Sequence, residues 1–172
     1  AQRPEVDVQV HLLPFFLNPD TPPAGESYRD FLIGKFGSAQ KVEALHAQVR
    51  EAGAPDVTFE FERIQVRPLT LHAHRLTYRA QALGATPAQL AALAEGIFSA
   101  HFQQGRNIGD VEVLADIATA AGDDRDAVLA YLNSDEHVTN VQRMAQQIST
   151  QGVTGVPFFI LNRKLAVSGA QS

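Results

Sequence analysis

The stretch that decides the fold lies near the end of the chain and contains two short apolar runs. It reads Gly152-Val153-Thr154-Gly155-Val156-Pro157-Phe158-Phe159-Ile160-Leu161-Asn162-Arg163-Lys164-Leu165-Ala166-Val167-Ser168-Gly169. The polar Asn-Arg-Lys turn between the apolar runs predicts a buried β-hairpin. Pro157 opens the first strand, where a missing N–H is tolerated, and an X-Pro bond is the usual site of a cis peptide. We therefore expect a cis bond between Val156 and Pro157.

Helical signals fill most of the chain before this hairpin. Serine, threonine and aspartate caps precede apolar residues at helical spacing, and glycines close several segments. The expected caps are Ser38, Thr70, Thr86, Asp110, Asp123 or Asp124, and Ser134, after a first helix that begins at Tyr28. Thr86 starts a capping box, and the helix behind it carries one wide apolar stripe. That stripe predicts buried side chains at Leu90, Leu93, Ala94, Ile97 and Phe98. Alternating residues 57–61 indicate a short extended segment.

A strand is expected at the start of the chain, because Val6, Val8, Val10 and Leu12 alternate with polar residues. Four prolines in residues 14–23 then exclude a regular helix or a central strand. The order is therefore one strand, a block of helices and a distant hairpin. That order indicates an α/β protein with a thioredoxin-like fold and an inserted helical subdomain.

Composition narrows the classes of function. The chain has 172 residues, 45% of them hydrophobic and 19% charged, which suits a single globular domain. A net charge of −5 without a Lys/Arg cluster argues against nucleic acid as a partner. No apolar run approaches the ~18 residues of a membrane span, so we expect no membrane contact. The chain has no cysteine, which excludes thiolate chemistry by these residues alone, and no motif indicates a metal or another cofactor.

Three motifs carry a resemblance to a known family. The hairpin from Gly155 to Lys164, followed by Ala-Val-Ser-Gly-Ala-Gln, resembles the cis-proline hairpin of the DsbA-like thiol oxidoreductases, and most closely their FrnE-like branch. Pro-Phe-Phe-Leu-Asn-Pro at 14–19 and Thr-Leu-His-Ala-His-Arg-Leu at 70–76 resemble two further signatures of that branch. The resemblance implies one thioredoxin-like domain over residues 1–172, incomplete at both ends, with a helical insertion at about 26–151.

The resemblance also implies a site. Pro157 would be the catalytic-loop residue that faces a Cys-x-x-Cys motif, and Val156 with Gly155 would hold an extended substrate. Thr70 and His74, at the start of a helix, would lie near the same site and contact substrate. The alternative for His74 is a structural histidine with a hydrogen bond inside the fold.

The implied activity is thiol–disulfide exchange or isomerisation on a protein or small thiol/disulfide substrate. The first strand and the catalytic cysteines are expected before Ala1, so these residues alone should be inactive. Without that strand, residues 6–13 and Phe158–Leu161 would each leave unpaired backbone in the sheet. The first residues do not resemble a signal peptide, which favours a cytoplasmic location. The sequence leaves open whether the protein forms a homodimer.

Two alternatives share the fold. The first is a glutathione-dependent isomerase of the 2-hydroxychromene-2-carboxylate type, in which serine replaces the reactive cysteine and which fits a chain without cysteine. The second is a redox-inactive peptide-binding relative that keeps only the cis-proline edge. The residues before Ala1 would separate all three readings.

Overall fold

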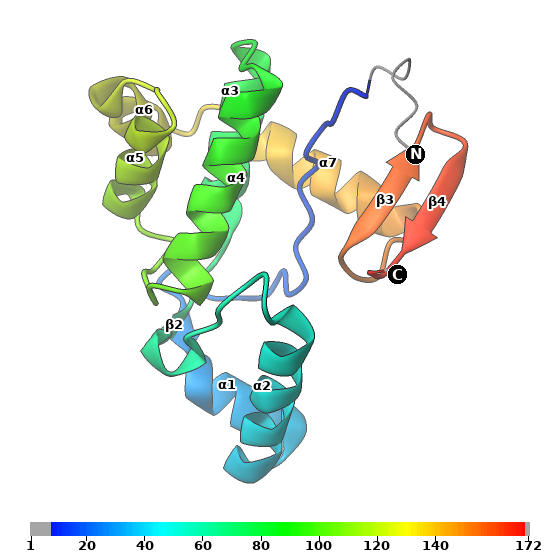
Figure 1. Cartoon of the computed structure of the whole chain (residues 1–172). Helices are drawn as coiled ribbons and strands as arrows, with labels where there is room; N and C mark the ends of the chain where they lie inside the picture. The colour runs from blue at the N-terminus through cyan, green and yellow to red at the C-terminus, as the bar shows by residue number, and fades with distance from the viewer. Residues whose placement is uncertain (1–7, 171–172) are drawn as a thin grey trace.

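The structure, a computed structural model, describes residues 8–170, and helices make up most of it (Figure 1). The helices are α1 (Tyr28–Phe36), α2 (Ala39–Gly53), α3 (Leu71–Ala82), α4 (Pro87–Phe102), α5 (Val111–Ala120), α6 (Arg125–Leu132) and α7 (Val138–Thr150). The strands are β1 (Glu26–Ser27), β2 (Val66–Arg67), β3 (Phe158–Leu161) and β4 (Leu165–Ser168), and a 3-10 turn covers Phe61–Arg63. β1 pairs with β2 and β3 pairs with β4, both antiparallel.

The largest hydrophobic core lies among α3, α4, α5 and α6, which pack side by side (Figure 1). Leu76, Leu114 and Val128 are fully buried at its centre. The expected stripe of α4 is largely confirmed, since Leu90, Leu93 and Ile97 are 7%, 4% and 8% exposed. Phe98 is an exception at 60% exposed, because its side chain lies off the face that meets the core.

Local capping signals predicted most helix starts. The side chains of Ser38, Thr86, Asp110 and Asp124 each accept a hydrogen bond from a backbone N–H in the first turn. The expected cap at Ser134 is wrong, because α7 begins only after His137, whose φ is 60°. Ser134 instead donates its hydroxyl hydrogen to the carbonyl of Tyr131, at 2.7 Å, and so closes α6.

The start of the described chain does not form the expected strand. Val8 and Val10 are 68% and 62% exposed, and no strand pairs with residues 8–13 in the described part of the molecule. The backbone of Leu12 is held instead by the side-chain amide of Gln81, which accepts from its N–H at 2.9 Å and donates to its carbonyl at 3.0 Å. The expected positions Val6 and Asp7 lie outside the described residues.

The expected extended segment at 57–61 is also wrong. Phe61 lies instead in a 3-10 turn, 6% exposed, because its ring packs among other aromatic rings. The β1–β2 pair was not predicted, since each strand has only two residues.

The predicted hairpin forms, with Phe158 opposite Ser168 and Leu161 opposite Leu165. Its turn uses left-handed φ values of 52° and 57° at Asn162 and Arg163. The expected burial is wrong for the described residues: Leu161 is 51% exposed and Leu165 67%. Within residues 8–170 no further strand pairs with this two-stranded ladder, and most of its side chains are exposed.

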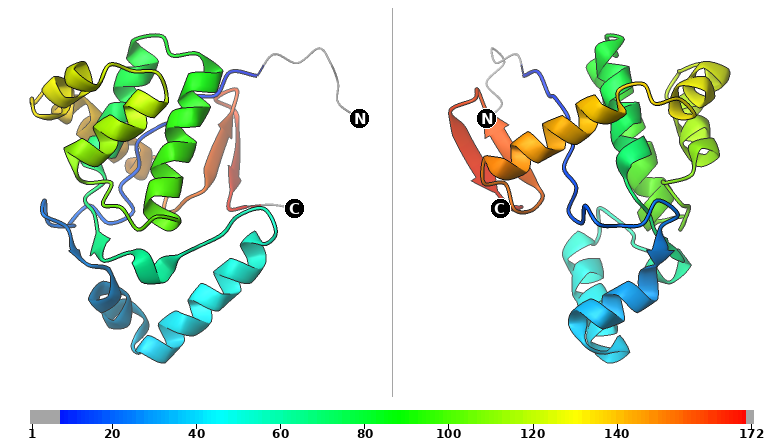
Figure 2. Two further views of the ribbon diagram at one scale, coloured as in Figure 1. Left: turned by 60° about the vertical axis from the view of Figure 1, so that its left-hand side comes forward. Right: turned by 180° about the vertical axis from the view of Figure 1, so that it is seen from behind.

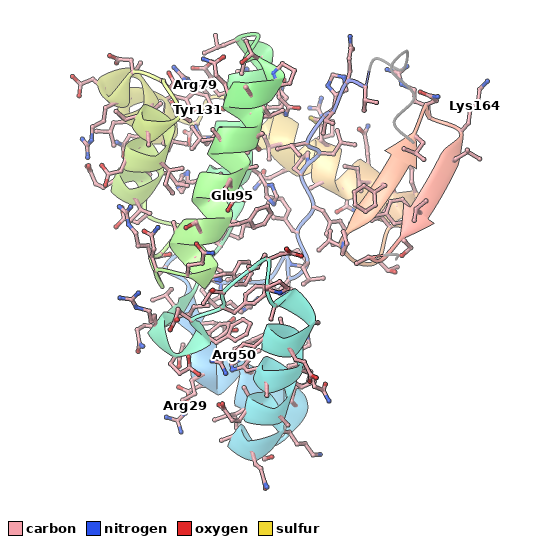
Figure 3. All side chains as sticks on the ribbon, in the orientation of Figure 1. Arg29, Arg50, Arg79, Glu95, Tyr131 and Lys164 are labelled. Carbon is pink, nitrogen blue, oxygen red and sulfur yellow. The ribbon has the colours of Figure 1, made fainter. Side chains whose placement is uncertain are left out.

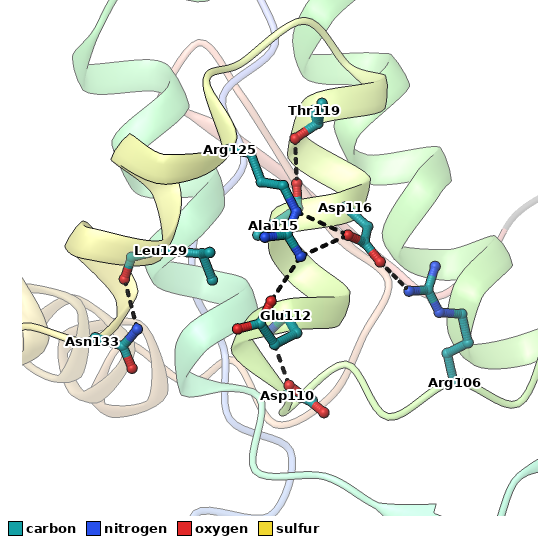
Figure 4. A network of polar contacts seen from close by, with 9 residues as sticks. All are labelled: Arg106, Asp110, Glu112, Ala115, Asp116, Thr119, Arg125, Leu129 and Asn133. Atoms are coloured by element: carbon teal, nitrogen blue, oxygen red, sulfur yellow. Dashed lines mark hydrogen bonds and ion pairs between the residues drawn. The ribbon is translucent and has the colours of Figure 1, made fainter.

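A polar network covers the outer side of α5 and α6 (Figure 4). Arg125 bonds Glu112 at 2.7 Å and Asp116 at 3.1 Å, while Arg106 reaches the other oxygen of Asp116 at 2.8 Å. The hydrogen bonds from Arg106 and Arg125 lower the pKa of Asp116. The groups are solvent-exposed, where screening leaves such pairs little effect on stability.

Candidate functional site

The turn from α7 into β3 holds three of the expected site residues. Val153, 7% exposed, anchors the segment after α7, and the Val156–Pro157 peptide bond is cis. Val156 itself is 59% exposed. Gly169 donates its N–H to the carbonyl of Pro157 at 2.9 Å, which continues the hairpin ladder up to the turn. The turn is therefore fixed by the hairpin on one side and presents Val156 to solvent.

The other two expected site residues, Thr70 and His74, lie at the start of α3. The side chain of His74 contacts the proline-rich segment of the same chain. Its Nε2 lies 3.1 Å from the carbonyl oxygen of Phe15, and its ring meets Phe16 edge-on with centroids 5.3 Å apart. Burial lowers the pKa of His74, while the bond to Phe15 opposes this effect. His74 is thus neutral near pH 7 and donates from Nε2 to the proline-rich segment. Thr70 stands at the N-cap position without a capping bond from its side chain.

A hollow of about 380 Å³ lies beside the start of α3. It is bordered by the proline-rich segment, the start of α3 and α7. Its lining consists of Phe16, Pro19, Leu69, Leu71, Gln142, Ala145, Gln146 and Ser149. The hollow adjoins Thr70 and the ring that packs on His74. Within residues 8–170, no hydrogen bond or ring contact joins Thr70 or His74 to the Gly155–Pro157 turn.

The sequence analysis gave no role to Arg75. The structure shows that this side chain, in the first turns of α3, is fully buried. Its guanidinium donates to four backbone carbonyls at 2.7 to 3.0 Å, those of Tyr131 and Leu132 at the end of α6 and those of Ser134 and Glu136 in the segment that follows it. It also lies 3.1 Å from Nδ1 of His72. Burial and the Arg75 charge both lower the pKa of His72. Since a guanidinium only donates, Nδ1 of His72 accepts and its Nε2 carries the proton.

The aromatic ring of Tyr131 completes this anchor. The guanidinium carbons of Arg75 and Arg79 lie 4.8 and 5.6 Å from its centroid, and Arg79 and Tyr131 adjoin in Figure 3. A buried cation with four carbonyls as partners is suited to hold α3 against α6 and α7, not to react. The sequence signal that could have indicated this burial is the position of Arg75 between Ala73 and Leu76, two residues of the apolar helix face.

Two further features, a metal site and a membrane-spanning helix, find no support in the described residues. No three histidine, aspartate or glutamate side chains gather as a metal site in residues 8–170. Over the same residues, no helix has the length and apolar character to span a membrane.

Together, the helix-rich α/β architecture and the cis-proline turn before a hairpin define a protein of the thioredoxin-fold class. A family model described as "DSBA-like thioredoxin domain" matches residues 1–172, and the chain belongs to that family. The fold is similar to the crystal structure of a probable DsbA oxidoreductase, SCO1869, from Streptomyces coelicolor, with a TM-score of 0.77 and 28% sequence identity. The match covers 90% of this chain and 66% of that one. No curated protein sequence matches the chain.

The contact of His74 gives a direct prediction. Replacing His74 by alanine should lower the free energy of unfolding by about 1–2 kcal/mol, because the Phe15 carbonyl loses its donor and Phe16 loses its neighbouring ring. Urea denaturation measures the loss. His11→Ala, at an exposed position, is the matched control and should leave stability unchanged. Equal losses for the two variants would show that His74 does not hold the proline-rich segment.

Proposed function

We propose that this chain is the substrate-positioning part of a thiol–disulfide oxidoreductase of the FrnE-like type. Its substrates would be protein or small-molecule disulfides. The reacting cysteines would belong to a part of the protein outside these 172 residues, since this stretch contains none. The family membership supports the class of chemistry, and the 66% coverage of the matched oxidoreductase leaves room for that part.

The observation that carries the proposal is the Val156–Pro157 turn. The ladder bond from Gly169 fixes the backbone at Pro157, while the exposed Val156 leaves the neighbouring backbone within reach of a partner. Pro157 has no N–H, so it brings no competing donor to the reacting sulfurs. Val156 can instead align an extended substrate by strand addition.

The open hairpin gives independent support. In the described residues, β3 has no neighbour except β4, and residues 8–13 have no partner strand. Apolar side chains are exposed on both segments, with Val10 at 62% and Phe159 at 52%. An added strand would pair this backbone and cover these side chains. The strand that leads into a Cys-x-x-Cys helix would bring its first sulfur toward the cis-proline turn.

The chemistry at that turn would be an exchange of sulfur bonds. A cysteine thiolate attacks one sulfur of the substrate disulfide, a new S–S bond forms, and the second substrate sulfur leaves as a thiolate. The second cysteine then attacks the mixed disulfide and releases the reduced substrate, so the enzyme carries the disulfide. A thiolate at a helix N-terminus has the lowered pKa that this attack requires.

An assay on the native full-length protein tests this proposal. We expect that protein to catalyse the reduction of insulin disulfides by a small thiol, and alkylation of its cysteines should abolish the catalysis. The Pro157→Ala variant should accumulate mixed disulfides with substrate on non-reducing gels, because the exchange site is less tightly enclosed. The 172 residues alone should be inactive. Activity that persists after alkylation would contradict the proposal.

The complete absence of cysteine here favours one second candidate, a glutathione-dependent isomerase. That enzyme would use a serine where the oxidoreductase has its first cysteine. It would act on an aromatic carboxylate in the presence of glutathione and would be indifferent to alkylation of the protein. The same assay therefore separates the two functions.

A further inference from the structure

A cluster of aromatic rings joins the α1–α2 pair to the end of α4. His46 on α2 is stacked between Tyr28 and Phe61, with ring centroids 6.1 and 4.2 Å away. Tyr28 in turn meets the edge of His101 on α4, at 6.4 Å, and Phe102 lies 4.7 Å from that histidine. The cluster thus contains two histidines and spans three helices and the 3-10 turn.

The α1–α2 pair has few other attachments. No residue of α1 is buried, and Val42 is the only buried residue of α2. In Figures 1 and 2 the pair lies at the lower end of the molecule, apart from the core around α5 and α6. Its other links include the two-residue ladder of Glu26–Ser27 with Val66–Arg67, the N–H of Tyr28 that donates to the carbonyl of Gln65 at 3.0 Å, and the Arg67 guanidinium 3.7 Å from the Phe31 ring. Arg50 also donates to the carbonyl of Phe59 at 3.1 Å. The aromatic cluster is what joins the pair to α4.

His101 is the sensitive member of the cluster. It is 9% exposed, and its Nδ1 is buried without a hydrogen-bond partner. Protonation of His101 would place a positive charge on this buried ring, whose Nδ1 has no hydrogen-bond partner within the described residues. A buried charge without a partner is strongly unfavourable, and separation of the rings would expose it to water.

The charged groups around the cluster do not remove this penalty. Glu43, Arg50 and Glu62 face His46. The guanidinium of Arg50, labelled in Figure 3, also lies 5.4 Å from the centroid of the Phe61 ring. The carboxylates oppose the effect of burial on the pKa of His46, which is nevertheless lowered. At His101, only the backbone of Arg106 opposes burial, and the pKa is lowered there as well. Burial raises the pKa of Tyr28, so its hydroxyl stays neutral.

We propose that His101 is a pH-sensitive latch, so that the α1–α2 pair detaches from α4 when this side chain takes up a proton. This inference does not depend on the oxidoreductase activity. The sign follows from proton binding: docked His101 binds a proton less readily than an exposed histidine, whose pKa is 6.5. The latch is fully closed above pH 6.5 and weakens as the pH falls from there toward the lowered pKa.

Hydrogen exchange of the protein between pH 7.5 and 5.0, corrected for intrinsic rates, tests the latch. Opening of α1 and α2 should rise by up to about tenfold for each pH unit within that window, while α5 should not change. His101→Leu keeps an apolar side chain without a titrating group and should remove most of the pH dependence, leaving only the part that comes from His46, whose pKa is also lowered. His11→Gln is the matched control and should retain it.

Two further measurements keep the assignment falsifiable. His46→Phe should retain most of the pH dependence, since His101 is unchanged. If His46→Phe removes it and His101→Leu does not, the latch is wrong. Should His101→Leu fail to fold, NMR titration of the wild-type ring decides. A His101 pKa of 6.5 or above, or α1–α2 exchange that is flat down to pH 5.0, would overturn the proposal.

Discussion

Replacing Arg75 by leucine should lower the free energy of unfolding by about 3–5 kcal/mol. The substitution removes the donors of four backbone carbonyls at the end of α6 and the beginning of the segment that leads to α7. Each buried acceptor without a partner costs roughly 1–3 kcal/mol, and relaxation of the loop toward water recovers part of that sum. The leucine also leaves Tyr131 without the cation that lies 4.8 Å from its ring.

Chemical denaturation of Arg75→Leu measures this loss, with two controls. Arg125→Leu removes an arginine that also makes several bonds but is exposed, so it should change stability far less. Arg75→Lys keeps the charge but cannot reach all four carbonyls, and it should retain only part of the stability. An Arg75→Leu loss no larger than that of Arg125→Leu would mean that the anchor does not hold α3 to α6.

Local signals explain why the helices could be predicted. The capping box at Thr86 and the cap at Ser38, whose side chain accepts from the N–H of Lys41, depend on residues within one turn of each other. The cis Val156–Pro157 bond likewise depended on a short motif. The family motifs extended this information to the fold, because they imply neighbours that local patterns do not contain.

Contacts between distant segments could not be predicted in the same way. The bond of His74 to Phe15 joins residues 59 positions apart, so the sequence left its role open between substrate and structure. The alternation of apolar and polar residues at 6–12 favours a β-strand, but it does not indicate which segment would pair with that strand. Leu12 is held by Gln81 instead, and no period in the sequence indicates that contact. The prediction of a buried hairpin was wrong for the same reason, because burial depends on which distant segments pack against the hairpin.

Helix α4 offers the sharpest test of what the apolar stripe does. Leu93→Ala should lower the free energy of unfolding by about 2–5 kcal/mol, because Leu93 is 4% exposed within the core of α3, α4 and α5. Leu93 also borders a hollow of about 170 Å³, which the truncation would enlarge. Phe98→Ala on the same helix removes a larger side chain that is 60% exposed, and it should cost less than about 1 kcal/mol. Urea denaturation of both variants gives the comparison. A Leu93→Ala loss below about 0.5 kcal/mol, or a larger loss at Phe98, would place the other face of α4 against the core.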